Sequence, residues 1–126
     1  MSDDNNKLFA LRGATTVKAN DADQILQATE ELLVEIMSRN NLTPAAMVSC
    51  TFTTTADLDA QFPAVAARGI GMNTVPLLCA GEINVPGSLP LAIRVMLHYY
   101  APTGHESRHV YLRDAVTLRT DLTAAQ

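Results

Sequence analysis

Tryptophan is absent from the sequence, and other aromatic residues are few: three Phe and three Tyr among 126 residues. Apolar residues nevertheless make up 48% of the chain, so the core must be built mainly from aliphatic side chains. A chain of this length forms one domain and buries about two thirds of its unfolded surface. We therefore expect a single domain over residues 1–126, with flexible ends at residues 1–7 and 120–126.

Positive charge is also scarce. Nine Lys and Arg stand against 13 Asp and Glu, which gives a net charge of −4 and an isoelectric point near 5.2. This balance argues against nucleic acid or an anionic membrane as the main partner. An anion-binding site in this protein would need several arginines brought together locally.

Long hydrophobic runs are missing as well. No stretch is long enough to cross a membrane, and residues 1–7 are polar and lack the apolar centre of a signal peptide. We therefore expect a cytoplasmic protein that makes no membrane contact.

Metal and disulfide chemistry have little support in the sequence. Cys50 and Cys79 have no CxxC spacing and are expected to stay reduced. His105 and His109 are four residues apart, but the turn sequence at 102–104 precedes them, so they are not expected to share a helix face. No metal site is expected.

The apolar pattern predicts five strands, because these segments are rich in β-branched residues or alternate between apolar and polar positions. Their expected ranges are 8–17, 47–54, 73–79, 91–100 and 109–118.

One long amphipathic helix is predicted between Asp21 and Asn40. Asp21 suits an N-cap, and Gln24 lies three residues on, from where its side chain can reach back. The predicted apolar face consists of Ile25, Leu32, Leu33, Ile36 and Met37. A shorter helix is expected at 62–69, and a single helical turn after Thr43.

This order of elements predicts an α+β fold: a single small domain with a mixed β-sheet covered by one long helix. One helix covers only one face of a sheet. The other face needs a partner, and a second copy of the chain is the simplest source.

The apolar stretch 75–95 contains a thiol, an acid and a guanidinium, at Cys79, Glu82 and Arg94. Charges inside such a stretch must find partners. Two interpretations are open: a structural Glu82–Arg94 ion pair, or a polar pocket for a ligand. Arg68, at the end of the second helix, has a sufficient structural explanation in the helix dipole.

Seven motifs occur in a recognisable order along the chain. They are Arg12-Gly-Ala-Thr-Thr-Val17, Ile25-Leu-Gln27, Phe62-Pro-Ala64 with Arg68, Val75-Pro76 with Cys79 and Glu82, Ile93-Arg-Val-Met96, Arg108-His-Val-Tyr-Leu112, and Leu118-Arg119 with Asp121-Leu122. In this order they resemble the motifs of monofunctional chorismate mutases of the trimeric α/β-barrel (non-helical) class. The resemblance extends from about residue 8 to about residue 122.

The resemblance implies a homotrimer that forms a pseudo-α/β-barrel, with active sites at the subunit interfaces. It implies a cofactor-free isomerase that converts chorismate to prephenate by a [3,3] rearrangement, on the route to phenylalanine and tyrosine. Negative charge grows on the ether oxygen in the transition state, and no proton needs to move. Such a catalyst needs a fixed cation at that oxygen and cations for two carboxylates; arginine suits both tasks.

The resemblance also implies residue roles. Arg94 would be the cation at the ether oxygen and would touch the side-chain carboxylate. Arg12 and Tyr111 would bind carboxylate, while Glu82 and the Cys79 region would contact the ring.

Further contacts are implied from the rest of the chain. Phe62, Ala64 and Arg68 would approach from the neighbouring subunit of the trimer. Leu118 and Arg119 would lie at the mouth of the site, where the end of the chain could close over the substrate.

Two positions depart from the family pattern. Val65 stands where a lysine can follow the Phe-Pro-Ala element, and Leu78 stands where a threonine can precede the cysteine. Both are expected at the rim or behind the pocket, where they would affect affinity rather than the reaction.

Two alternatives remain from the sequence. Small trimeric α/β-barrel proteins that resemble this fold include enamine/imine deaminases, which rely on one arginine and ordered water. The second alternative is a degenerate mutase that binds its ligand without converting it. The presence of Arg12, Glu82, Arg94 and Tyr111 together argues against both.

Overall fold

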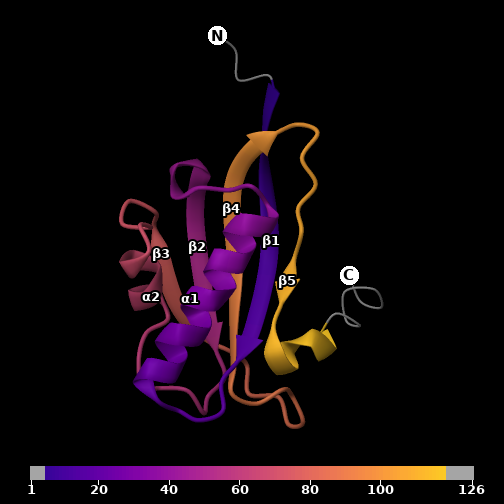
Figure 1. Ribbon diagram of the computed structural model, residues 1–126. Helices are drawn as coiled ribbons and strands as arrows, with labels where there is room; N and C mark the ends of the chain where they lie inside the picture. Colours follow the sequence, from indigo (N-terminus) through magenta and orange to yellow (C-terminus); the bar gives the residue numbers. More distant parts are fainter. Residues whose placement is uncertain (1–4, 119–126) are drawn as a thin grey trace.

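The structure, a computed structural model, describes residues 5–118 and consists of one sheet with two helices packed against it (Figure 1). The strands are β1 (Asn6–Thr16), β2 (Met47–Thr54), β3 (Leu77–Gly81), β4 (Ala92–Pro102) and β5 (Val110–Tyr111); the α-helices are α1 (Ala22–Arg39) and α2 (Ala64–Gly69), and the 3₁₀ helices are η2 (Pro44–Ala46) and η3 (Arg113–Leu118). The strand order is β3-β2-β4-β1-β5. β4 is antiparallel to β1 and β2, whereas β3 and β5 run parallel to their neighbours, which confirms the predicted mixed sheet.

α1 begins and ends where the sequence predicts. The Asp21 carboxylate accepts a hydrogen bond from the Gln24 amide over 3.0 Å. The Gln24 side chain reaches back further than expected, accepting hydrogen bonds from the amides of Lys18 and Ala19 over 3.2 Å each. At the other end, the Asn40 side chain donates to a carbonyl of the last turn over 2.9 Å. Each such cap contributes about 1 kcal/mol, so the helix ends are fixed locally.

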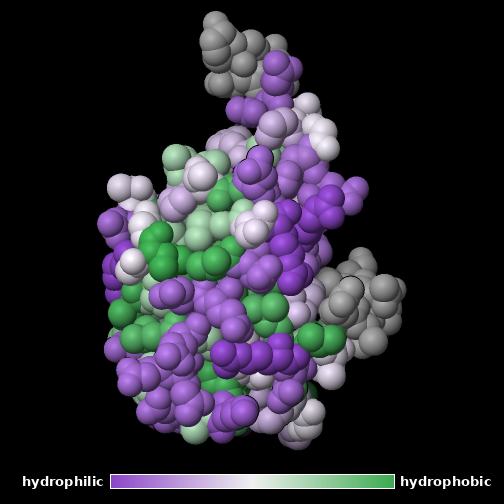
Figure 2. Space-filling model, viewed as in Figure 1, coloured by the Kyte–Doolittle hydropathy of each residue, from purple (hydrophilic) through white to green (hydrophobic). Residues whose placement is uncertain are grey.

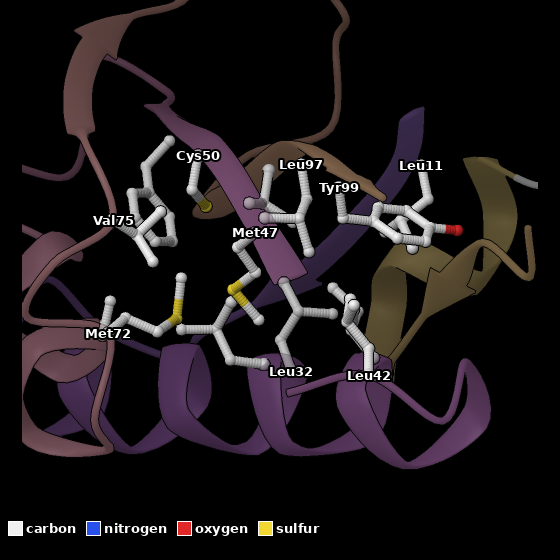
Figure 3. Close-up of a cluster of buried hydrophobic side chains, with 14 of the residues drawn as sticks. Leu11, Leu32, Leu42, Met47, Cys50, Met72, Val75, Leu97 and Tyr99 are labelled. Atoms are coloured by element: carbon white, nitrogen blue, oxygen red, sulfur yellow. The ribbon is translucent and has the colours of Figure 1, made fainter. Parts of the chain in front are cut away.

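The core lies between the sheet and α1 and is mainly aliphatic, as predicted. The fully buried residues on the apolar face of α1 are Ile25, Ala28, Leu32, Leu33 and Ile36. In Figure 3, Leu32 of α1 and Leu97 of β4 belong to the same layer of apolar side chains. Burying a side chain of this size contributes about 1.5–3 kcal/mol.

β1 approaches α1 most closely at Gly13. A Cβ atom built at this position would lie 2.8 Å from Cδ1 of Ile36 and 3.2 Å from Cδ1 of Leu32. Only glycine fits there without displacing core side chains. The glycine that follows Arg12 therefore sets the distance between β1 and the helix.

Within residues 5–118, no helix covers the sheet face opposite α1. Along β4, Ile93, Val95, Leu97 and Tyr99 are buried against the core, while the alternate residues Arg94, Met96, His98 and Tyr100 point away from it. We call the side that carries these four residues the open face. Met96 is 38% exposed and Tyr100 52% exposed. The other side, seen in Figure 2, carries hydrophilic side chains with separate hydrophobic patches between them.

The strand expected at 109–118 is wrong over most of its length. Only Val110 and Tyr111 pair with β1, and the chain then turns at Arg113, whose φ is 54°, into η3. Among the described residues, Thr16, the last residue of β1, therefore has no strand partner on this side of β1. Thr16 instead binds the turn: its carbonyl accepts from Arg113 Nη1 over 3.1 Å, and its hydroxyl accepts from the Asp114 amide over 3.2 Å.

Other boundaries differ from the predictions. Asn6 and Lys7 belong to β1, where they pair with Pro102 and Ala101, rather than to the flexible end expected at 1–7. β3 begins at Leu77 instead of residue 73. The carbonyl of Asn5, just before β1, accepts a hydrogen bond from the Thr103 amide over 2.7 Å. The other residues predicted to be flexible, 1–4 and 120–126, lie outside the described part of the chain. None of the helices within residues 5–118 is long and apolar enough to cross a membrane.

Candidate active site

A row of polar side chains crosses the open face near the ends of β1 and β2. Ala14 of β1 pairs with Tyr111 on one side and with Arg94 on the other, and Arg94 pairs with Thr53. Directly opposed residues of a sheet point to the same face. Arg12, two residues before Ala14, also lies on this face. The fold thus brings together three of the residues predicted at a site from segments about 100 residues apart in the sequence.

Arg94 and Glu82 form the ion pair that their spacing suggested. Arg94 Nε lies 3.2 Å from Glu82 Oε2, and the Thr53 hydroxyl donates a hydrogen bond to the same oxygen over 2.6 Å. Glu82 is further fixed by its own amide, which donates to the Thr54 carbonyl over 2.9 Å. The Arg94 Nε is buried and its N–H is not aligned for a hydrogen bond, so the contact is electrostatic.

The two side chains of the pair differ in their exposure to solvent. The side chain of Glu82 is 14% exposed, whereas that of Arg94 is 41% exposed although its Nε is buried. Solvent therefore reaches the rest of the Arg94 side chain. The carboxylate is thus enclosed, while the guanidinium stays accessible to a ligand.

A cavity lies next to Arg94. Its volume is about 470 Å³, and it is lined by Arg94, residues 87–90 of the loop before β4, and Thr117 and Leu118 of η3. This size suits a small organic ligand. A larger hollow between α1 and α2 is lined by Glu30, Glu31 and Glu35, which makes it unsuitable for an anion.

Arg12 is connected to the segment before β5 through His109. The Arg12 amide donates a hydrogen bond to His109 Nδ1 over 2.9 Å, so the imidazole takes the place of a strand partner. Partial burial, with a smaller contribution from the Arg12 guanidinium, lowers the pKa of His109. The neutral imidazole is the form that accepts this hydrogen bond.

Comparison with known proteins decides the family. The family model described as chorismate mutase type I matches residues 8–122. The chain belongs to this chorismate mutase family. Two curated relatives are named chorismate mutase AroH: one from Thermus thermophilus is 48% identical over 118 residues, covering 92% of this chain and 97% of the relative, and one from Bacillus subtilis is 41% identical over 115 residues, covering 90% and 91%.

A solved structure agrees with this assignment. A chorismate mutase from Clostridium thermocellum superposes with a TM-score of 0.83 at 47% identity, covering 87% of this chain and 99% of that one. The family recognised from the sequence motifs is confirmed, and so is the predicted fold of the single chain.

One chain of this chorismate mutase does not unite all the predicted site residues. α2, which carries Arg68 in its last turn, packs against α1 and β3 on the helix-covered side of the sheet, while Arg94 points to the open face. Phe62 is 64% exposed at the start of this segment, and Ala64 is buried in the core. Any contact of Ala64 with a ligand would therefore involve its backbone.

Cys79 lies on the side of the sheet opposite to Arg94. It pairs with Phe52, which is fully buried under the helices, and it packs against the same core. Its thiol therefore does not join the polar row within the chain. Both cysteines are free thiols, and burial, with a contribution from Cys79, raises the pKa of Cys50 to about 12. A thiol with such a pKa is protonated and unreactive at neutral pH.

The remaining predicted residues are placed as follows. Leu118 lines the cavity beside Arg94, and Arg119 lies outside the described residues. Leu78 is 62% exposed, and Val65 borders the hollow between α1 and α2. Within residues 5–118 no group of three His, Cys, Asp or Glu could hold a metal ion.

Thr53 joins the Glu82–Arg94 pair, a contact that the sequence did not predict. Its hydroxyl orients Glu82, and Glu82 in turn lies beside Arg94. The alternation of the segment 47–54 was the available signal, because it places Thr51 and Thr53 on the face opposite to Phe52. The segment alone did not show which face would be open.

The hydrogen bond at His109 predicts a pH-dependent stability. Because its pKa is lowered in the folded state, the unfolded chain binds more protons as the pH falls below about 6.5, and stability decreases. We expect a His109→Asn variant, which keeps an acceptor for the Arg12 amide, to lose less thermal stability than the wild type between pH 7 and about pH 5. Thermal unfolding at several pH values measures this.

A matched replacement serves as the control for His109. His98→Asn changes a histidine whose Nδ1 lies 3.5 Å from the Ser49 hydroxyl instead of bonding a strand amide. We expect His98→Asn to lose as much thermal stability as the wild type between pH 7 and about pH 5. Equal losses for wild type and His109→Asn would show that His109 contributes no pH dependence.

Proposed function

We propose that the open face carries the active site of this chorismate mutase and that Arg94 is its transition-state cation. The protein converts chorismate to prephenate, an intramolecular rearrangement in aromatic amino acid biosynthesis. The observation that carries the proposal is the arrangement of Arg94: its Nε lies against the enclosed Glu82, and its accessible side chain borders a cavity of ligand size.

The reaction explains why such an arrangement would be catalytic. The breaking C–O bond leaves negative charge on an ether oxygen that is nearly neutral in the bound substrate. A guanidinium already held in place stabilises that charge without reorganising, so it binds the transition state more tightly than the substrate. Thr53 holds the Glu82 carboxylate, and the contact with Glu82 limits the rotamers available to Arg94.

We assign carboxylate binding to Arg12 and Tyr111, which share the open face with Arg94. A dianion needs more than one cation, and the net charge of −4 makes this local pair of arginines unusual in the molecule. Glu82 would accept a hydrogen bond from the ring hydroxyl of chorismate. No cofactor takes part in the proposed mechanism.

We further propose that the active enzyme is a homotrimer with sites between subunits. The open face has exposed apolar residues such as Met96 and Tyr100, which a second copy would bury. Phe62 and Arg68 lie on a different side of the chain from Arg94, so a neighbouring subunit would have to present them. We expect this trimer to act in the cytoplasm.

The proposed activity is tested by adding purified protein to chorismate and following the loss of its ultraviolet absorbance, with prephenate identified as the product. Unchanged chorismate, with the protein folded, would contradict the proposal and favour a protein that only binds its ligand.

The absence of proton transfer gives a further prediction. We expect kcat to stay nearly constant between about pH 5.5 and 8.5, because no general acid or base takes part and the substrate carboxylates titrate well below this range. Replacing water with deuterium oxide should leave kcat almost unchanged. A bell-shaped pH profile with a large solvent isotope effect would instead indicate proton-transfer chemistry of the deaminase kind.

A further inference from the structure

Leu91 has an unusual backbone conformation immediately before β4. Its φ of 53° lies in the left-handed region, which residues with large side chains rarely adopt. Its side chain packs against the buried cluster that contains Val17 and Ile93, so the conformation does not belong to a loose loop tip. Such a conformation persists only where the surroundings enforce it, and it concentrates at functional sites.

Two side chains from the loop between β2 and α2 enforce this conformation. Asp57 Oδ2 accepts a hydrogen bond from the Leu91 amide over 3.0 Å, and Asp57 Oδ1 accepts one from the Thr55 hydroxyl. The Thr55 hydroxyl accepts from the Ala92 amide over 3.0 Å, and the Ala92 carbonyl accepts from the Thr55 amide over 3.1 Å. From β1, the Val17 amide donates to the Leu91 carbonyl over 3.0 Å. Every backbone polar group of Leu91 and Ala92 is thus bound.

This hydrogen-bonded group acts on the segment that carries the proposed cation. Arg94 follows Leu91 by three residues, and residues 87–90 before it line the cavity. We propose that Asp57, together with Thr55, is a positioning residue of the active site: it holds Leu91 in the left-handed conformation and thereby fixes where β4 places the Arg94 guanidinium. This inference rests on the proposed role of Arg94.

The position of Asp57 makes the inference specific. Asp57 is exposed, and it does not line the cavity at Arg94. Substituting an exposed residue of this kind usually changes stability little. A misplacement of about 1 Å at a catalytic group, however, lowers the rate by about 10²-fold. A large effect on kcat from an exposed carboxylate outside the cavity would therefore indicate positioning.

The experiment compares three changes in the full chain. Asp57→Ala removes both acceptors, and we expect kcat to fall about 10–10²-fold, with KM changing much less. Asp57→Asn keeps an acceptor for the Leu91 amide, so it should retain most of kcat. In the Asp57→Ala background, Leu91→Gly permits a positive φ without steric cost and should recover part of kcat. The same change removes packing of the Leu91 side chain, so it should lower the melting temperature further.

Opposite movement of activity and stability in that double variant separates positioning from simple stabilisation, which would lower both. Asp59→Ala is the matched control: Asp59 is an exposed carboxylate two residues away that accepts from the Asn20 side chain over 2.6 Å and does not bond β4. We expect it to keep kcat. Hydrogen exchange at the Leu91 and Ala92 amides should be faster in Asp57→Ala than in the wild type, and it should be unchanged in Asp59→Ala.

The possible failures are distinguishable. A wild-type chain without chorismate turnover would contradict the proposed function. Normal turnover of the wild type with unchanged kcat in Asp57→Ala would overturn the positioning role while leaving the proposed function intact. Equal losses of kcat in Asp57→Ala and Asp59→Ala would also overturn it, since the effect would then belong to the loop as a whole.

Discussion

Replacing Arg94 with citrulline is expected to lower kcat by at least about 10²–10³-fold, the scale for losing one preorganised donor to a developing oxyanion. Citrulline has nearly the shape of arginine but no charge. Because the ether oxygen becomes charged only in the transition state, the loss should appear in kcat, and KM should change much less. Steady-state kinetics of the citrulline variant, assembled by peptide ligation, measure kcat and KM. Arg94→Lys keeps a charge but loses the planar fork, so we expect it to rescue only part of the rate.

The same variant tests the structural interpretation of the Arg94–Glu82 pair. Removing one partner of a fully buried pair costs about 3–5 kcal/mol. Arg94 is 41% exposed, and Thr53 continues to bind Glu82, so we expect a much smaller loss of stability. Citrulline at Arg39, which forms an ion pair with Glu35 on the helix surface, is the control and should leave kcat unchanged. A collapsed melting temperature, or a raised KM with kcat unchanged, would show that Arg94 is not the transition-state cation.

Mixing two inactive variants is expected to restore activity if the site lies between subunits. Arg68→Ala and Arg94→Ala chains each lack one arginine of the proposed site. In a mixed trimer with head-to-tail interfaces, an Arg68→Ala chain supplies Arg94 and its neighbour supplies Arg68. Random assembly from equal amounts would complete about one quarter of the sites. Activity after co-refolding, with mixed trimers identified by differential tags, measures the recovery.

The fold supplies a sharp control for this mixing experiment. Arg12 and Arg94 lie on the same open face of one chain, so Arg12→Ala and Arg94→Ala chains cannot complement each other. We expect no recovery from that mixture. If Arg68→Ala and Arg94→Ala chains form mixed trimers but remain inactive, or if light scattering shows a fully active monomer at micromolar concentration, the interface proposal is wrong.

The ends of α1 could be predicted from the sequence. The cap at Asp21 and the end at Asn40 fixed α1, because capping depends on residues within one turn. The single long helix correctly predicted that one face of the sheet would be covered and the other open. The cost of leaving either charge alone in an apolar stretch made an ion pair between Glu82 and Arg94 one of the two interpretations, and the structure contains that pair.

Features that depend on strand pairing could not be obtained in the same way. Successive side chains of a strand point to opposite faces, so the side on which Cys79 lies depends on a register that the sequence does not specify. The strand expected at 109–118 stopped at Tyr111, where the chain turns and Arg113 and Asp114 bind Thr16, a residue about 100 positions away in the sequence. The contact of Asp57 with Leu91 is equally non-local.

The position of β1 in the sheet has a consequence for how the chain folds during synthesis. β1 is made early, yet its antiparallel partner is β4, so that Thr16 pairs with Ala92 and Asn6 with Pro102. At roughly 5–20 residues per second, a ribosome needs several seconds to make the intervening chain, and during that time the first strand has no native edge to bind. Pairing over such sequence distances also places folding in the slow, millisecond-to-second range. The apolar strand that later orients Arg12 is thus the segment that depends longest on protection from aggregation while the protein is being made.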